Sequence, residues 1–538
     1  MRKLMSTMAV FCLGIPAVSV FADAVVQVDA SAPLQVMDGF GATHISLVFG
    51  TRDNLTPGLR AKAIQAVYGD VGLNLGNVES GLVESPPDYA LRRNDNGNPD
   101  SIDWAGFQLS YADNMKAKLL DPARPLGFTD FSIAQKINVR WNSPWLNTLK
   151  AADYNQYLAE CAEQVAAGAI YHRDKLGVTT RYIHLFNEPL NGNTELQGSL
   201  QDMVAIIKAA GARLRKEGFA DLKFVIPNSE TATASLAEAK AILADPEARK
   251  YVGVIGYHCY PYGSPYASVP RILAASGTGT PDAGEIAVRA QLRALGRQYG
   301  IPLWMTEVSH SEVAYNAFDG VRGRAIHIHD EIAYAGASAF FGMNNMWDQT
   351  AQQEHFGNGD VLSDGDTFAL IENDKDKVDI TAIGYAVGHY ARWIKKGAVL
   401  LTSVSQDKLL QVSAFLDAAG SRLVLVLINN NASPQTVDVA MQGAVLTAAP
   451  APKGEQSTAS AFWQAITPSA PDASGRWKLT LPALSVTSVS AGLSALPTLV
   501  LRPARGAPVL RMGNQGVTLD GRVLPWPYPN TFFAARAR

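Results

Sequence analysis

The stretch Arg181-Tyr-Ile-His-Leu-Phe-Asn-Glu-Pro-Leu-Asn191 decides the fold of this chain. Its first part is a short apolar and aromatic run, which is typical of a parallel strand buried on both faces. Pro189 has no backbone N–H to donate to a sheet, so the strand must end beside Glu188. The stretch therefore predicts a buried strand with a carboxylate at its carboxyl end, where catalytic groups lie in an α/β barrel.

A second stretch, residues 302–309, repeats this pattern. Leu303-Trp304-Met305 is apolar and is followed by Thr306 and Glu307. His310 and Glu312 follow closely, so the sequence leaves open which acidic group of this segment is functional. Two predicted strands thus each end near a glutamate.

The other predicted strands alternate with amphipathic helices at residues 153–171, 200–216 and 285–299. Repeated strand–helix units imply a parallel sheet with helices outside. The predicted strand ends are Gly41, Glu79, Trp141, Glu188, Ser229, His258, Glu307 and Trp347. Eight strands close a barrel, and the predicted fold class is therefore α/β, a (β/α)8 TIM barrel.

Two details of this assignment depend on local pattern. Residues 38–42 are glycine-rich and predict a turn that leads into a strand, and residues 137–142 predict the strand that ends near Trp141. Residues 81–104 are rich in Pro, Asn and Asp and predict a long loop. Loops of this length inside a compact domain usually serve function.

The texture of the sequence changes after residue 396. Residues 397–491 show short strands and turns, which predict a C-terminal β-sandwich with a Pro-, Ala- and Ser-rich loop at 448–474. Residues 492–538 form an Arg-rich extension to which the sequence assigns no role.

The N-terminal segment predicts export. Residues 1–24 combine Arg2 and Lys3 with an apolar run and small residues near Ala24, which is the pattern of a signal peptide; a membrane anchor is the alternative. No later stretch is long and apolar enough for an integral membrane segment. The predicted location is therefore secreted or periplasmic.

Charge and cysteine content limit the partners. The formal net charge is −3, so the charge gives no reason to expect a nucleic-acid partner. Beyond residue 24 only Cys161 and Cys259 remain, without metal-like spacing. Two buried free thiols are the favoured interpretation, and a disulfide is the alternative.

Paired glutamates at strand ends suit the hydrolysis of a glycosidic bond. That reaction needs one carboxylic acid to protonate the leaving oxygen and one carboxylate to attack or to activate water. A surface position is the usual fate of a glutamate, but Glu188 and Glu307 would face each other across the mouth of the predicted barrel. A separation of about 5–5.5 Å would make the enzyme retaining.

The order of several motifs resembles clan A glycoside hydrolases and most closely glycoside hydrolase family 30. The motifs are Val25-Val26-Gln27-Val28-Asp29, Asp38-Gly39-Phe40-Gly41, Phe186-Asn187-Glu188-Pro189, Gly256-Tyr257-His258-Cys259-Tyr260, Trp304-Met305-Thr306-Glu307 and residues 383–390. Asn-Glu-Pro is specific only to the clan, so the family assignment rests on the order of all the pieces.

This resemblance implies a (β/α)8 barrel at residues 38–396 and a strand at 25–37 that joins the C-terminal β-sandwich. It implies that Glu188 is the acid/base and Glu307 the nucleophile of a retaining β-glycosidase that needs no cofactor or metal. Asn187 matches the asparagine that binds the sugar 2-hydroxyl. His258 and Tyr260 match the aromatic pair that lines the site, although a structural role for His258 stays open.

Two tryptophans are further candidates for substrate binding. Trp141 and Trp347 would offer aromatic faces to sugar rings, and core packing is the alternative for each. The chain also departs from the family pattern. Asn77 stands where the family usually has an arginine, with Arg140 as a candidate substitute, and residues 347–354 contain no arginine that would bind a glucuronate branch.

The sequence thus predicts a secreted, retaining β-glycosidase that acts on β-linked poly- or oligosaccharides, with a carbohydrate as its only partner and the monomer as its expected state. A glycolipid hydrolase of the glycosylceramide type is the alternative within enzymes. A catalytically inactive carbohydrate-binding barrel is the alternative outside them. A metal-dependent hydrolase is disfavoured, because only His258 and the two glutamates converge.

Overall fold

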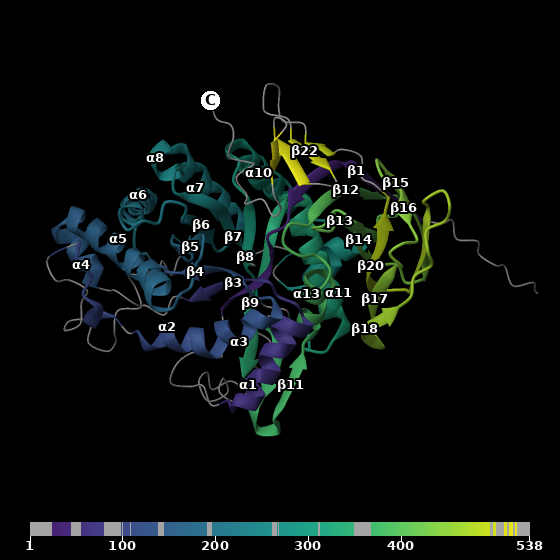
Figure 1. The fold of residues 1–538 in the computed structure, drawn as a ribbon, viewed down its shortest axis with the longest axis horizontal. Helices are drawn as coiled ribbons and strands as arrows, with labels where there is room; N and C mark the ends of the chain where they lie inside the picture. Colours follow the sequence, from purple (N-terminus) through teal and green to yellow (C-terminus); the bar gives the residue numbers. More distant parts are fainter. Residues whose placement is uncertain are drawn as a thin grey trace, which may run out of the picture.

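The computed structural model has two bodies, a barrel ringed by helices and a β-sheet domain at its side (Figure 1). It describes residues 24–44, 55–79, 98, 100–107, 109–137, 145–190, 196–260, 266, 268–309, 312–348 and 367–494, and short strands at 499–501, 510–513, 516–519 and 522–524. None of the helices in these ranges combines the length and the hydropathy that a membrane span needs.

Eight strands form the barrel, as the sequence predicts. They are β2 (Gly39–His44), β3 (Leu75–Glu79), β4 (Asp130–Ala134), β5 (Tyr182–His184), β6 (Lys223–Ser229), β7 (Val252–His258), β8 (Leu303–Glu307) and β9 (Ala337–Asp348). From β3 to β9 each strand pairs in parallel with the next, and β2 pairs in parallel with β9. The amide of Asn74 donates to the carbonyl of Phe40 at 3.2 Å, which brings β2 beside the entry to β3 and closes the ring.

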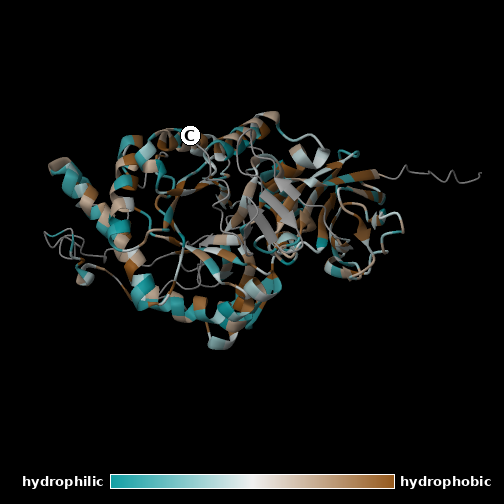
Figure 2. Ribbon diagram, turned by 45° about the horizontal axis from the view of Figure 1, so that its top comes forward, coloured by the Kyte–Doolittle hydropathy of each residue, from teal (hydrophilic) through white to brown (hydrophobic). Residues whose placement is uncertain are grey.

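Helices cover the outside of the ring, which Figure 2 shows with hydrophilic residues on its outer rim. The main ones are α1 (Pro57–Ile64), α2 (Ser110–Met115), α4 (Trp145–Ala152), α5 (Tyr154–Ile170), α6 (Leu200–Lys216), α7 (Ala232–Ala244), α9 (Val269–Ala275), α10 (Ala283–Tyr299), α11 (Phe318–Asp330) and α13 (Ala382–Ala391). The predicted helix at 200–216 is confirmed. Its Ser199 and Asp202 form the reciprocal capping box that holds its first turn.

Side chains fill the inside of the barrel. The interior layer consists of Leu75, Tyr182, Val225, Val254, Trp304, Ala339 and Phe341. Successive strand residues point to opposite faces, so Ile255 and Tyr257 of β7 belong instead to the core between strands and helices. The barrel is therefore a packed core, and chemistry is confined to the strand ends.

Two barrel strands differ from the sequence prediction. The third barrel strand is β4 at Asp130–Ala134, upstream of the predicted strand at 137–142, because residues 130–134 pair with β3 and residues 133 and 134 also pair with β5. Trp141 and Arg140 lie outside the described residues. The glycine-rich segment is itself strand β2, and its glycines permit close packing: a Cβ on Gly41 would lie 2.2 Å from the carbonyl oxygen of Leu75.

A short β-hairpin that was not predicted from the sequence extends the barrel sheet beside β9. Strand β10 (Thr367–Glu372) pairs in parallel with β9, and β11 (Lys377–Ile380) pairs antiparallel with β10. Of the predicted long loop at 81–104, the structure describes residue 98 and residues 100–104, where a 3-10 turn begins at Trp104.

The second body is the predicted β-sandwich. Its strands are β1 (Ala24–Val36), β12 (Val399–Ser405), β13 (Leu410–Leu416), β14 (Arg422–Asn429), β15 (Gln435–Gln442), β16 (Leu446–Thr447), β17 (Lys453–Thr458), β18 (Ala461–Ile466), β19 (Trp477–Leu481) and β20 (Ser485–Leu493). β1 pairs antiparallel with β12 and parallel with β15. The segment 448–474 is not a plain loop, because β17 and β18 form a hairpin there that pairs with β20.

The sandwich packs directly on the barrel helices. His389 of α13 lies between the hydroxyls of Ser457 and Ser488, at 2.7 and 2.9 Å. Phe415 of β13 shares one apolar core with Tyr390 of α13. After the sandwich, β21 (Leu499–Leu501), β22 (Leu510–Gly513), β23 (Gly516–Leu519) and β24 (Arg522–Leu524) form a small antiparallel sheet within the Arg-rich extension.

Candidate active site

Strand β5 (Tyr182–His184) is shorter than predicted and ends four residues before Glu188. Glu188 has a backbone conformation that few glutamates adopt. Its φ is 42°, in the left-handed region. Such a conformation costs of order 1–3 kcal/mol and persists only where the surroundings impose it. Here the amide of Glu188 donates to the carbonyl of Asn228 at 2.9 Å, and Pro189 follows directly. The strained turn therefore fixes where the carboxylate lies, and its side chain remains 21% exposed.

Glu307 is the last residue of β8, and its side chain is only 5% exposed. The hydroxyl of Tyr260 donates to Glu307 Oε1 at 2.7 Å. Burial and the charge of Glu307 raise the pKa of Tyr260 well above its usual value, so the phenol keeps its proton and acts as a donor. A neutral donor at this distance stabilises the ionised form of the carboxyl it contacts.

His258 lies between the two glutamates. This residue ends β7, and its Nδ1 is 3.1 Å from Glu188 Oε1 and 3.9 Å from Glu307 Oε1. The rings of His258 and Tyr260 meet edge to face, with centroids 5.8 Å apart. The end of β7 thus supplies a polar contact to each glutamate.

The two carboxyl groups face each other closely. One oxygen of Glu188, one oxygen of Glu307 and a ring nitrogen of His258 all lie within 4.8 Å of one another. An oxygen–oxygen distance below 4.8 Å fits the roughly 5–5.5 Å carboxyl separation of retaining glycosidases better than the roughly 6.5–9.5 Å of inverting ones. The same three groups also have the chemistry to hold a divalent cation, and a chelator test separates the two possibilities.

Asn228 is a residue that the sequence analysis missed. It contacts both Glu188, which follows β5, and Thr306 in β8. Its φ is 57°, and its side chain is buried. Its carbonyl accepts from the amide of Glu188, and its Oδ1 accepts from the hydroxyl of Thr306, beside Glu307, at 2.9 Å. Its position in Pro-Asn-Ser after an apolar strand was the available signal, because asparagine tolerates the left-handed conformation.

The remaining candidates are spread more widely. Asn187 adjoins Glu188 and is half-buried. Trp347 lies near the end of β9 and is partly exposed, with its indole nitrogen buried. Glu312, the alternative to Glu307 as the functional acidic residue, is exposed and lies beyond β8.

The position of the missing family arginine is also described. Asn77 lies in β3, and its side chain is buried, with Oδ1 3.5 Å from the hydroxyl of Ser132 on β4. A buried amide thus stands at the position that the sequence analysis matched to the family arginine. Cys161 and Cys259 are both buried free thiols, as the sequence analysis favoured.

No protein-family model and no curated protein matches the sequence. Solved structures do match the fold. A family 30 subfamily 8 xylanase from Clostridium acetobutylicum has a TM-score of 0.60 at 16% identity, over 87% of this chain and 99% of that chain. The family 30 xylanase C from Talaromyces cellulolyticus has a TM-score of 0.59 at 16% identity, over 87% and 100%.

A third match differs in the named activity. The endo-β-1,6-glucanase BT3312 has a TM-score of 0.61 at 16% identity, over 87% of this chain and 94% of that chain. The chain therefore has the barrel-plus-sandwich fold of family 30 and related clan A glycoside hydrolases, which confirms the fold that the resemblance in its motifs implied.

Proposed function

We propose that this protein is a glycoside hydrolase that cleaves β-linked poly- or oligosaccharides with retention of anomeric configuration. The observation that carries the proposal is the facing pair of Glu188 and Glu307, with oxygens within 4.8 Å, at the strand ends of the barrel. The fold shared with family 30 xylanases and a β-1,6-glucanase supports the same reaction class.

In the first step, Glu307 is the nucleophile. A carboxylate oxygen of Glu307 forms a bond to the anomeric carbon while the bond from that carbon to the leaving oxygen breaks. Glu188, in its protonated form, gives its proton to the leaving oxygen. Tyr260 suits this division of roles, because its hydroxyl donates to Glu307 and stabilises the ionised carboxylate.

In the second step, Glu188 acts as a base. It takes a proton from a water molecule, the water oxygen bonds to the anomeric carbon, and the bond to Glu307 breaks. The product keeps the original configuration, and both carboxyl groups return to their starting states. His258, 3.1 Å from Glu188 Oε1, orients this carboxyl through both steps.

Asn187, His258, Tyr260 and Trp347 are the described residues that we assign to substrate binding, and Trp141 remains assigned from the sequence alone. Asn187 would hold the 2-hydroxyl of the sugar, and Trp347 would stack on a sugar ring. Neutral or unbranched β-linked chains suit this set, because residues 347–354 contain no arginine for a glucuronate branch.

Incubation with a panel of β-glucans, galactans, xylans and glucosylceramide tests the proposal. We expect release of reducing sugar from one substrate, loss of that activity in Glu188→Gln and Glu307→Gln, and the β-anomer as the first product by proton NMR. Release of the α-anomer would contradict the retaining mechanism. Binding without release by wild type would favour a carbohydrate-binding protein instead.

We also propose that residues 1–24 direct export and are removed. Residues 2–21 combine two basic side chains with an apolar run. A structural neighbour from Bacteroides fragilis, matching at a TM-score of 0.62 and 15% identity, is itself described as an exported protein. Mass spectrometry of the protein recovered from outside the cytoplasm should find a new N-terminus near residue 25, and an intact N-terminus would contradict export by cleavage.

A further inference from the structure

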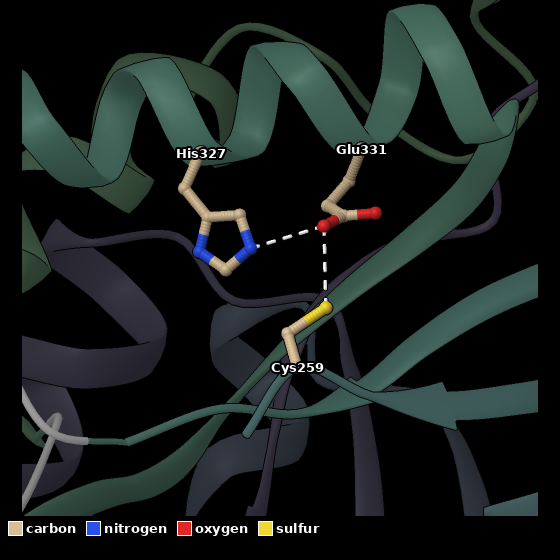
Figure 3. Close-up of side chains that lie close together, drawn as sticks. All are labelled: Cys259, His327 and Glu331. Carbon is tan, nitrogen blue, oxygen red and sulfur yellow. Dashed lines mark hydrogen bonds and ion pairs between the residues drawn. The ribbon is translucent and has the colours of Figure 1, made fainter. Parts of the chain in front are cut away.

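The outer face of β7 carries a second cluster, directly behind the candidate active site. His258 and Tyr260 point to Glu188 and Glu307, whereas Tyr257 and Cys259 point the opposite way, toward the helices. There they meet Glu331, which follows α11 as the first residue of η10 (Glu331–Ala335). Figure 3 shows Cys259 and His327 converging on Glu331.

Glu331 is a fully buried carboxylate with donors on both oxygens. Its Oε2 accepts from the hydroxyl of Tyr257 at 2.8 Å. Its Oε1 accepts from Cys259 Sγ at 3.2 Å and from His327 Nε2 at 3.0 Å. Arg289 of α10 adds a bond from Nε at 3.0 Å and a close ion pair from Nη2. The carboxylate therefore ties β7, α10 and α11 together.

The cation of this cluster is Arg289, so the Cys-His-Glu grouping is not a vacant metal site. The guanidinium contacts Glu331 and lies 3.5 Å from Cys259 Sγ. Arg324 Nη1 lies 2.7 Å from His327 Nδ1, and arginine can only donate. His327 must then carry its proton on Nε2, the nitrogen that faces Glu331, and has no lone pair there for a metal.

The protonation states agree with this arrangement. Burial lowers the pKa of His327 to about 4, so the ring is neutral. Burial and the charge of Glu331 raise the pKa values of Tyr257 and Cys259, so both keep their protons and donate. Burial alone would raise the pKa of Glu331, but Arg289 and His327 outweigh it and hold that pKa well below its usual range.

We propose that Glu331 is a positioning residue for the reaction: through Tyr257 and Cys259 it anchors the end of β7, so that His258 and Tyr260 are held against Glu188 and Glu307. The inference rests on the proposed function. The backbone between residues 257 and 260 is short, so a shift on the outer face must move the inner face as well. A misplacement of about 1 Å at catalytic groups can cost about 100-fold in rate.

The anchor is best tested without disturbing the buried charge. Tyr257→Phe/Cys259→Ala removes two hydrogen bonds to Glu331 and leaves the Arg289 pair in place. Tyr266→Phe is the matched control, because Tyr266 donates a similar buried bond of 2.7 Å to the neighbouring Asp330 and does not belong to β7. Tyr257→Phe/Cys259→Ser restores one donor.

We expect kcat of the double variant to fall about tenfold while KM changes by less than about twofold, and the serine variant to recover part of the loss. Amide hydrogen exchange at residues 257–260 should be faster in the double variant and unchanged in Tyr266→Phe. The exchange measurement needs no substrate, so it reports on the anchor even if no panel substrate is cleaved and the proposed function fails.

Three results would overturn the inference. The first is a double variant whose kcat and amide exchange equal those of wild type. The second is a loss of kcat in Tyr266→Phe as large as that in the double variant. The third is a rise in the Tm of wild type with added Zn²⁺ that Cys259→Ala abolishes. The last result would assign the cluster to a metal instead.

Discussion

Two clusters with similar chemistry lie on opposite faces of β7, and they differ in how their carboxylates are satisfied. Each brings three potential ligands within 4.8 Å: Glu188, His258 and Glu307 inside, and Cys259, His327 and Glu331 outside. The outer carboxylate is fully buried and paired with Arg289. The inner cluster sets two carboxyl groups against each other, with Glu188 partly exposed.

This difference fits the proposal that the inner cluster is reactive and the outer one structural. Two adjacent carboxyl groups cannot both ionise easily, which favours one protonated and one charged partner, as acid catalysis with a nucleophile requires. A carboxylate saturated by an arginine and neutral donors has a stable charge and no capacity left for chemistry. Composition alone would not distinguish the two clusters.

The largest expected effect is on the inner cluster. Glu307→Gln should reduce kcat beyond the roughly 10²–10⁴-fold that loss of a general acid or base costs, because the covalent step itself is lost. Initial rates on the substrate found in the panel measure this. Glu312→Gln is the control and should retain wild-type activity, since Glu312 is exposed and lies beyond β8. The reverse result would move the nucleophile to Glu312.

Glu188→Gln should have the next largest effect, and one that depends on the leaving group. A natural sugar leaving group needs a proton, so its cleavage should slow by about 10²–10⁴-fold. An activated aryl glycoside needs little protonation, so formation of its glycosyl-enzyme should be much less impaired. Pre-steady-state release of the phenol measures that step. Equal slowing with both substrates would argue against Glu188 as the acid.

The outer cluster should respond in stability. Glu331→Gln leaves the buried guanidinium of Arg289 without its main counter-charge, so we expect the free energy of unfolding to fall by about 3–5 kcal/mol. Urea unfolding measures it. The matched control is Glu285→Gln, because Glu285 pairs with the same arginine at 2.6 Å but is partly exposed. Its loss should be smaller, and equal losses would show that burial does not set the difference.

Asp330 gives a smaller, pH-dependent effect beside the outer cluster. Burial raises the pKa of Asp330 to about 7, against bonds from Tyr266 and Ser276 and the charge of Arg289 that lower it, while Glu331 adds to the rise. The folded state thus binds a proton that the unfolded state has lost, and wild-type stability should fall as pH rises from about 4 to about 7.

Comparison of wild type with Asp330→Asn isolates this group, because the other titrating residues cancel. The stability difference should move in favour of the variant by roughly 1.4 kcal/mol per pH unit within that window and then level off. Urea midpoints at pH 5, 6, 7 and 8 measure it. A difference independent of pH would show that Asp330 titrates alike in both states.

Chelation is expected to have no effect, and this sharpens the comparison of the two clusters. Dialysis against EDTA should leave both kcat and Tm unchanged, because Arg289 supplies the cation outside and the carboxyl pair needs none inside. Loss of activity that Zn²⁺ or Mn²⁺ restores would show that the inner cluster binds a metal. A fall in Tm without a fall in kcat would indicate that the outer cluster binds a metal.

The sequence alone predicted the elements whose signals are local. Thr306-Glu307 closes the apolar run of β8, and Ser199 with Asp202 marks the start of α6, whereas β5 ends at His184, before the stop predicted at Pro189. It misplaced β4 and overlooked the β17–β18 hairpin, because sheet pairing defines those strands more than hydrophobicity does. The site roles of all the candidate residues stay predictions: Glu188, Glu307, Asn187, His258, Tyr260, Trp141 and Trp347.

Only the tertiary structure decided which side chains of distant segments lie close together. Glu188 and Glu307 are 119 positions apart in the numbering, and no local pattern reports the distance between their oxygens or the placement of His258 between them. The same holds for Asn228 and for Glu331 behind Cys259. Local sequence determines strands, caps and turns because these depend on neighbouring residues. Closure of the barrel determines the site, because it joins groups that the chain itself keeps apart.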